Sequence, residues 1–319
     1  MRFHMLVAFS VFVLFALVPA LAGASAGDDR QRPTGGLGAQ DRPDRGPLGA
    51  DGSRVERPQR GQGAGVQGAG SGFRGEGPLR GRGRGLNTSC TVSTIGMFDP
   101  IVFPGQSGVG HMHVFFGNTT IDPDSTPASL RAANADRTAT TCRNRRDGSA
   151  YWVPQLLADG VAVDPVSVVA RYRPARGAER ATFPLDFQVI AGSSRATEQQ
   201  PGIGFHCLER GASRRLSVTP PTCSDGAMLA GVVRFETCWD GTNASSSDQS
   251  HVAGRVAGEC PATHPISIPS LELTVSYPAD GLDHDWTLAS GSTVGYHADF
   301  VNGWDTRSLR RLAGRAHRG

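Results

Sequence analysis

Short runs of β-branched and aromatic residues, separated by glycine and proline, most constrain what this chain can fold into. Residues 271–277 alternate strictly between apolar and polar side chains, which is typical of a strand with one buried face. Helix-period patterns are scarce, and residues 129–135 are predicted to form a single short helix. These features predict a mainly β fold, a β-sandwich or jelly-roll-like single domain with long loops. The clearest predicted strands are residues 114–116, 151–153, 166–172, 187–190, 232–235, 266–268, 271–277 and 296–301.

Residues 1–26 have the layout of a secretory signal peptide. A short basic start precedes an apolar stretch at 5–21, and the small residues Ala24, Ser25 and Ala26 follow. The alternative is a membrane anchor, but the apolar stretch is short for a span of roughly 20 residues. No later stretch is apolar enough to cross a bilayer, so we expect no transmembrane segment in the mature chain. We expect a secreted, extracellular protein that can associate with the cell envelope.

Residues 27–85 are predicted to be a disordered linker, because they contain almost no large apolar side chains. This segment carries 11 arginines and 7 acidic residues, whereas residues 86–306 carry 15 arginines and 22 acidic residues. The tail at 307–319 is basic, with five arginines and no acidic residue. An acidic folded region between basic tails is the opposite of a nucleic-acid-binding domain. We therefore expect no nucleic-acid partner, and a monomer whose folded region is 86–306.

The six cysteines all lie inside the region 86–306, and none lies in the linker. An even number of cysteines in an exported protein predicts disulfides. No pair has the Cys-x-x-Cys spacing of a zinc or redox site. The sequence leaves several pairings open, and we favour those that close nearby segments: Cys90–Cys142, Cys207–Cys223 and Cys238–Cys260.

Histidine and aspartate motifs gather near turns and strand ends. His111 and His113 follow a glycine-rich loop, and in a strand they would lie on the same face. His297 and Asp299 have the same spacing. Two or three imidazoles with one carboxylate are a common ligand set for Zn²⁺ or Cu²⁺. The predicted divalent metal site therefore comprises His111, His113, His251, His297 and Asp299; the alternative is that these histidines hydrogen-bond loop backbones and stabilise the loops.

Catalytic and sugar-binding residues are harder to assign from the sequence. Candidate catalytic residues are Asp99, Asp240, Asp299 and His297, but no sequence rule shows that two carboxylates meet as a retaining glycosidase requires. The Gly-x-Ser-x-Gly motif of a serine nucleophile is absent. We interpret residues 283–286, Asp-His-Asp-Trp, as a solvated loop after a turn. The predicted sugar-binding residues are Trp152, Trp239 and Trp304, whose rings would otherwise pin loops to the core.

Taken in order, these motifs resemble the DUF1996 family of secreted proteins, known from fungi and from bacteria including actinomycetes. The resemblance covers residues 95–305, nearly the whole folded region. One departure is at 138–142, where family members often have Cys-Thr-Thr-Cys and this chain has one cysteine fewer. The family has no known function, but its fungal members often carry cell-wall-binding modules, so the resemblance implies a polysaccharide environment. The matching motifs are Asp-Pro-Ile-Val at 99–102, His-x-His at 111–113, Tyr-Trp-x-Pro at 151–154, Cys-Trp-Asp-Gly at 238–241, Cys-Pro-x-x-His-Pro at 260–265 and His-Ala-Asp-Phe-x-Asn-Gly-Trp at 297–304.

Two classes of function follow from these observations. In the first, a secreted binding protein presents a His/Asp/Trp cleft to cell-envelope or extracellular polysaccharide, with a divalent metal such as Zn²⁺ or Cu²⁺. In the second, the protein is an extracellular, metal-dependent glycan hydrolase. A purely structural role on the cell surface is a third interpretation.

Overall fold

The computed structural model describes residues 85–175, 182–305 and 307–309. The predicted signal peptide, the predicted linker apart from Gly85, and most of the basic tail lie outside these residues. Among the described residues, no helix has both the length and the apolar character needed to cross a membrane.

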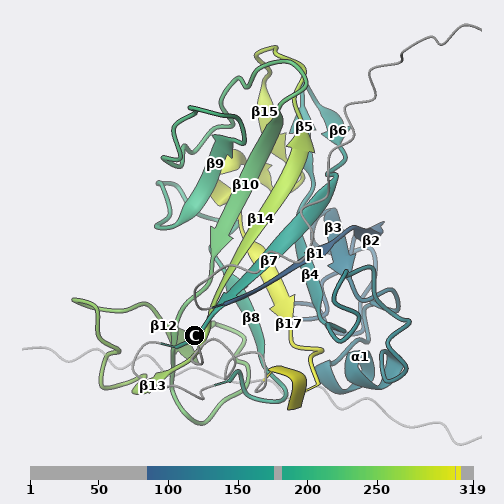
Figure 1. Cartoon of the computed structure of the whole chain (residues 1–319), viewed down its shortest axis with the longest axis vertical. Coiled ribbons are helices and arrows are strands. Elements are labelled where there is room, and N and C mark those ends of the chain that lie inside the picture. The colour runs from purple at the N-terminus through teal and green to yellow at the C-terminus, as the bar shows by residue number, and fades with distance from the viewer. Residues whose placement is uncertain (1–84, 176–181, 306, 310–319) are drawn as a thin grey trace, which may run out of the picture. The chain divides into compact units, whose positions relative to one another are not determined.

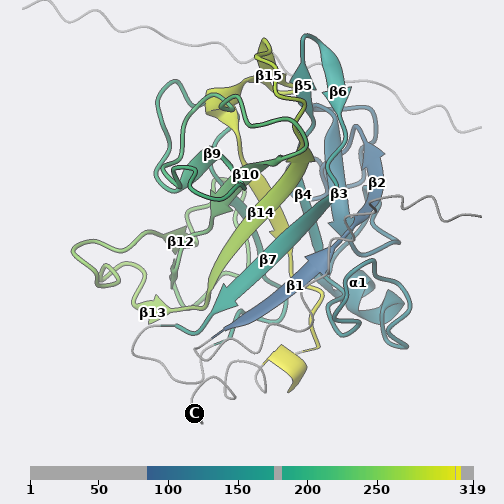
Figure 2. The same cartoon turned by 45° about the horizontal axis from the view of Figure 1, so that its top comes forward.

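Two five-stranded antiparallel sheets form the centre of the described chain (Figures 1 and 2). We name each after its middle strand. The β14 sheet has the order β1 (Leu86–Cys90), β7 (Ser167–Arg173), β14 (Ser270–Pro278), β10 (Met228–Arg234) and β9 (Ile203–Cys207). The β4 sheet has the order β2 (Val92–Gly96), β3 (His113–Gly117), β4 (Ala150–Pro154), β17 (Ala298–Val301) and β8 (Gln188–Ala191).

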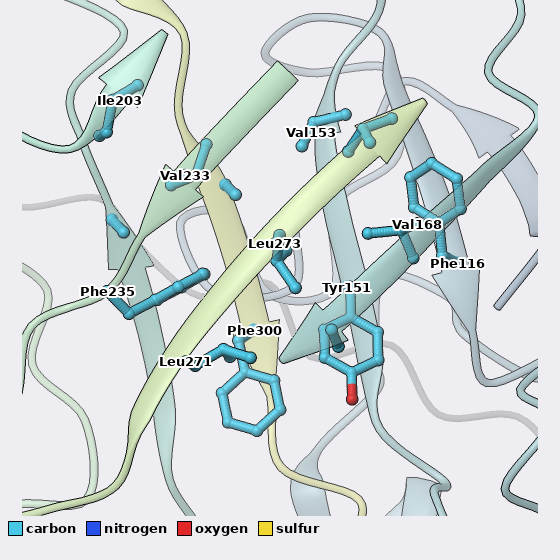
Figure 3. Close-up of a cluster of buried hydrophobic side chains, with 14 of the residues drawn as sticks. Phe116, Tyr151, Val153, Val168, Ile203, Val233, Phe235, Leu271, Leu273 and Phe300 are labelled. Atoms are coloured by element: carbon cyan, nitrogen blue, oxygen red, sulfur yellow. The ribbon is translucent and has the colours of Figure 1, made fainter. Parts of the chain in front are cut away.

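The main hydrophobic core lies between these two sheets. Alternation along β14 buries Leu271, Leu273 and Val275 and leaves the residues between them partly exposed. Tyr151 and Phe300 of the β4 sheet belong to the same buried cluster (Figure 3). Side chains that far apart in the chain meet only because the sheets pack face to face. The predicted mainly β, sandwich-like fold is therefore confirmed.

The smaller elements lie around this sandwich. Helix α1 (Pro127–Ala133) begins two residues before the predicted 129–135. Thr126 caps it by accepting a hydrogen bond from the backbone of Ser129, whose side chain accepts one in return. A four-stranded sheet has the order β16 (Gly291–Ser292), β15 (Trp286–Leu288), β5 (Leu156–Ala158) and β6 (Val161–Val163). A three-stranded sheet has the order β12 (Val252–Ala253), β11 (Cys238–Trp239) and β13 (Ile266–Ser267). The 3₁₀ helix η1 spans Thr293–Gly295.

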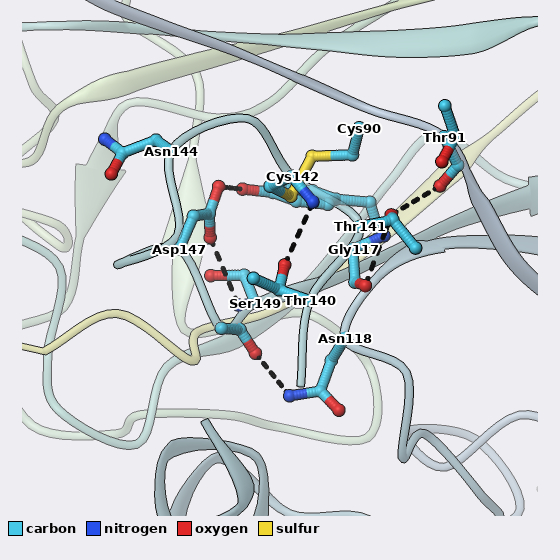
Figure 4. Close-up of a disulfide and its surroundings, with 12 residues drawn as sticks. Cys90, Thr91, Gly117, Asn118, Thr140, Thr141, Cys142, Asn144, Asp147 and Ser149 are labelled. Atoms are coloured by element: carbon cyan, nitrogen blue, oxygen red, sulfur yellow. Dashed lines mark hydrogen bonds between the residues drawn. A yellow bond between two sulfur atoms is a disulfide. The ribbon is translucent and has the colours of Figure 1, made fainter. Parts of the chain in front are cut away.

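All three predicted disulfides are present: Cys90–Cys142, Cys207–Cys223 and Cys238–Cys260. No described cysteine is free. Figure 4 shows the first of them beside Asp147 and Thr140. Three disulfides are compatible with an extracellular protein, since such bonds persist in oxidising surroundings.

Candidate metal centre

The face of the β4 sheet that points away from the sandwich carries a second, smaller core. Trp152 on β4 pairs in register with both Phe115 on β3 and Asp299 on β17. Because side chains alternate along a strand, all three project to this outer face. Phe98 and Leu130, from the loop after β2 and from α1, pack with Phe115 and Trp152 in one cluster. The outer face is therefore covered, and polar groups placed on it are buried.

Three histidines converge on this covered face. His113 begins β3, His111 lies two residues before it, and His297 directly precedes β17. The ring centroids are 4.2 Å apart for His111 and His113, 5.2 Å for His111 and His297, and 6.1 Å for His113 and His297. One ring nitrogen from each lies within 4.8 Å of the other two. Three imidazole nitrogens this close can converge on one ion after small side-chain rotations.

Backbone carbonyl groups fix the tautomers of two of these histidines. Nδ1 of His113 lies 2.9 Å from the carbonyl oxygen of Phe98, and Nδ1 of His297 lies 2.7 Å from that of Gly295. A carbonyl oxygen only accepts, so each Nδ1 donates its proton and each Nε2 keeps a lone pair. Burial lowers the pKa of His113 to about 3 and that of His297 to about 4, so both rings are neutral at neutral pH. Metal-bound histidines are commonly held in this way.

Several buried polar atoms of this cluster lack a hydrogen-bond partner among the described residues. They are Nε2 of His111, Nε2 of His113 and both carboxylate oxygens of Asp299. Asp299 is fully buried. Burial, together with the nearby charge of Asp99, raises its pKa well above the ordinary value. Burying a carboxylate without a donor is costly, and a cation at this position would offset that cost.

Asp99 adds a second carboxylate. Its Oδ1 accepts hydrogen bonds from the backbone N–H groups of Ile101 and Val102, at 2.8 and 2.9 Å. One oxygen of Asp99, one of Asp299 and one nitrogen of His113 lie within 4.8 Å of one another. Burial raises the pKa of Asp99, although these N–H groups lower it. This group and the three histidines share His113, and we call the five residues together the His/Asp cluster.

His251 and Asp240, also predicted as site residues, are engaged elsewhere. Nδ1 of His251 lies 2.8 Å from Oγ of Ser246, and its Nε2 lies 2.9 Å from the carbonyl oxygen of Gln188. With both ring nitrogens engaged, His251 has no lone pair for a metal and instead holds its loop against β8. Asp240 accepts backbone hydrogen bonds within its own turn. For these two residues the structural alternative describes the observed contacts.

The predicted tryptophan surface is wrong for two of its three members. Trp152 and Trp304 are fully buried, so neither can offer a ring face to a sugar. Nε1 of Trp304 donates to the hydroxyl of Tyr172 at 3.1 Å, inside the sandwich. Trp239 is half-buried in β11, and its Nε1 donates to the carbonyl of Asn243. The side chains of Trp152 and Trp304 therefore pack in the two hydrophobic cores.

Phe98 and Gly295 also contribute to the site, and no sequence pattern predicted their roles. Both act through backbone carbonyls, and a backbone role leaves no side-chain pattern to detect. Phe98 directly precedes Asp99, and Gly295 lies two residues before His297, so both flank motifs that the sequence did single out.

Comparison with known proteins gives a family match. A family model described as "Domain of unknown function (DUF1996)" matches residues 99–304, a range that contains the whole His/Asp cluster. No curated protein and no solved structure matches the chain.

Proposed function

The chain belongs to the DUF1996 family, and we propose that it binds a divalent transition metal ion, Zn²⁺ or Cu²⁺, in the His/Asp cluster. His111, His113 and His297 would supply three nitrogens, and Asp299 would supply a carboxylate oxygen. The observation that carries this proposal is the Asp299 carboxylate, which is fully buried beside His113 and Asp99 and has no hydrogen-bond donor among the described residues. Three imidazoles and one carboxylate suit either ion.

The surroundings of the cluster support a bound cation. The carbonyl groups of Phe98 and Gly295 orient two ligands and favour lone pairs on Nε2. The ring of Phe115 meets that of His113 edge to face, with centroids 5.9 Å apart, and gives the cluster an apolar side. His111 is the most exposed of the three histidines and follows a loop with left-handed glycines, of which Gly110 has φ 83°. This loop gives the simplest entry route for an ion.

We also propose that the protein acts outside the cell, at envelope or extracellular polysaccharide. The layout of residues 1–26 and the three disulfides support an exported protein. The family resemblance supports a polysaccharide environment.

The metal proposal is tested by measuring metal content and affinity of the purified full chain. We expect one equivalent of Zn²⁺ or Cu²⁺ by elemental analysis after loading and dialysis. The substitution His113→Gln should weaken affinity by about 100-fold or more, since it removes a ligand. His251→Gln is the matched control, because it removes a buried imidazole whose nitrogens are already engaged, and it should leave affinity within about threefold. A wild type without stoichiometric metal, or a His113→Gln variant that binds as tightly as wild type, would overturn the proposal.

A second candidate function is hydrolysis of a glycan, favoured by the position of Asp99 beside the proposed ligands. A bound metal ion of this kind can activate water. Asp99 would then take the proton from that water and return it to the departing sugar oxygen as the glycosidic bond breaks. The substitution Asp99→Asn keeps an oxygen for the N–H groups of Ile101 and Val102, so it should preserve the loop and the metal. If the wild type releases reducing ends from cell-wall glycans and Asp99→Asn does not, the protein is an enzyme; no release by the metal-loaded wild type would leave binding alone.

A further inference from the structure

A hollow of about 220 Å³ lies beside β15, and none of its lining residues belongs to the His/Asp cluster. Most of its wall is apolar and includes Leu229, Pro278 and the Cys223 end of a disulfide. Its polar lining comes from Asp280 and His284. A mostly apolar hollow with a few convergent polar groups has the composition of a small-molecule site.

His284 is fixed between two carboxylates. Its Nδ1 lies 2.7 Å from Oδ2 of Asp159, and its Nε2 lies 3.1 Å from both oxygens of Asp280. Carboxylates accept hydrogen bonds, so both ring nitrogens donate and the imidazole carries a positive charge. Asp159 also accepts the backbone N–H of Asp285 at 2.9 Å. These contacts join two segments that lie 125 residues apart, so the polar side of the hollow is held in place before any ligand arrives.

Trp286 and Leu282 give the hollow an aromatic and aliphatic side. The rings of Trp286 and His284 meet edge to face, with centroids 5.2 Å apart. Nε1 of Trp286 is buried and has no hydrogen-bond partner among the described residues. Leu282 is 62% exposed, which is high for a leucine that lines a hollow. An exposed leucine beside an indole ring suits a bound ligand.

We propose that this hollow is a sugar-binding subsite that takes one neutral pyranose ring of a glycan. The C–H face of such a ring would pack on Trp286 and Leu282. Its hydroxyl groups can donate to the carboxylate of Asp280, which lines the hollow. An anionic ligand would meet the carboxylate of Asp280, and a purely apolar one would displace water from that carboxylate without offering it a donor. The hollow is smaller than the roughly 300 Å³ of the smallest typical ligand pockets, which favours a single ring.

The test uses the indole N–H signals of the ¹⁵N-labelled full chain in two-dimensional NMR. The four tryptophans give four such signals, and the signal that is absent from Trp286→Phe belongs to Trp286. The probes are the methyl glycosides of glucose, mannose, galactose and N-acetylglucosamine. At least one should shift the Trp286 signal saturably and leave the signals of the buried Trp152 and Trp304 in place.

A pair of matched variants locates the contact. Asp280→Asn should weaken the affinity for the tightest-binding glycoside by about tenfold, the loss expected when a charged hydrogen-bond acceptor becomes neutral. Asp283→Asn lies in the same loop but does not line the hollow, so it should leave the affinity unchanged. His113→Gln should also leave it unchanged, which separates this proposal from the metal proposal.

Three results would overturn the subsite. The first is that no glycoside moves the Trp286 signal. The second is that Asp280→Asn and Asp283→Asn have equal effects. The third is that hexanol moves the signal more strongly than any glycoside, in which case the hollow takes an apolar ligand.

Discussion

Asp147 and Asp299 are both fully buried, yet their surroundings are opposite. Asp147 accepts hydrogen bonds from the hydroxyl of Tyr151 at 2.7 Å and from the backbone N–H of Ser149 at 3.1 Å (Figure 4). Tyr151 in turn bonds Tyr172 inside the sandwich. Asp299 accepts none from the described residues. The fold supplies donors to the carboxylate of Asp147 but, among the described residues, none to that of Asp299, and this difference supports the proposed metal site.

The histidines repeat the same contrast. His251 has partners on both ring nitrogens, whereas His113 has a partner on Nδ1 and a buried, unpartnered Nε2. A histidine that only stabilises a loop has no need of a free, oriented lone pair. The satisfied set, Asp147 and His251, and the unsatisfied set, Asp299 and His113, should therefore respond differently to metal and to substitution.

The largest expected effect concerns the satisfied carboxylate. Burial raises the pKa of Asp147 from 3.8 to about 7, against the hydrogen bonds of Tyr151 and Ser149 that lower it. The folded state thus binds this proton more tightly than the unfolded state. The resulting stabilisation is complete below a pH of about 4 and is lost as the pH rises through about 7. Its size is on the order of 4 kcal/mol, from roughly three pKa units at about 1.36 kcal/mol each.

Urea unfolding of wild type and Asp147→Asn, in chelator and over this pH range, measures the effect. The free energy of unfolding of wild type minus that of the variant should fall as the pH rises. Other titrating groups, including His113, are common to both proteins and cancel when they lie outside the Asp147 network. A difference that stays constant from acid to neutral pH would show that Asp147 keeps an ordinary pKa.

The next effect in size separates the two histidines. Zn²⁺ at 100 times its dissociation constant should raise the free energy of unfolding of wild type by about 2.7 kcal/mol, because it binds only the folded state. His251→Gln should start from a lower stability but gain the same increment. His113→Gln should gain almost nothing. Thermal or urea unfolding with and without Zn²⁺ measures this increment for wild type and both variants. If His251→Gln loses the increment, the ion binds at a different site from the one proposed.

Much of the fold was predictable because its signals are local. Strict alternation at 271–277 identified β14, and β-branched and aromatic runs identified most other long strands of the sandwich. β9 (Ile203–Cys207) was missed, because a glycine and a histidine interrupt its apolar pattern. Helix α1 was predicted two residues late, since its start depends on the cap at Thr126.

The candidate site was predictable only in part, because tertiary contacts decide which polar atoms remain free. The spacings of His111 with His113 and of His297 with Asp299 predicted shared faces, and all four residues belong to the two groups that share His113. Which histidine keeps a free nitrogen depends on carbonyl groups from distant loops, which no local pattern reveals. The Tyr-Trp motif at 151–152 shows the same limit. Alternation sends Tyr151 into the sandwich and Trp152 to the other face, but only the fold shows that a loop and a helix cover that face.

The smallest expected effect tests the unsatisfied carboxylate directly. In metal-free protein at neutral pH, Asp299 must either bury a charge without donors or hold a proton well above its ordinary pKa, and either costs stability. Asp299→Asn removes that cost but leaves a buried amide, so the free energy of unfolding should rise by about 1 kcal/mol. The substitution Asp147→Asn, measured at a pH of about 5, should lower the free energy of unfolding. With Zn²⁺ present, wild type should be more stable than Asp299→Asn. The amide at position 299 is a poorer metal ligand than the carboxylate, so the wild type gains more stability from the ion. If Asp299→Asn instead destabilises the metal-free protein as much as Asp147→Asn does, then Asp299 is a structural carboxylate and the contrast between the two is lost.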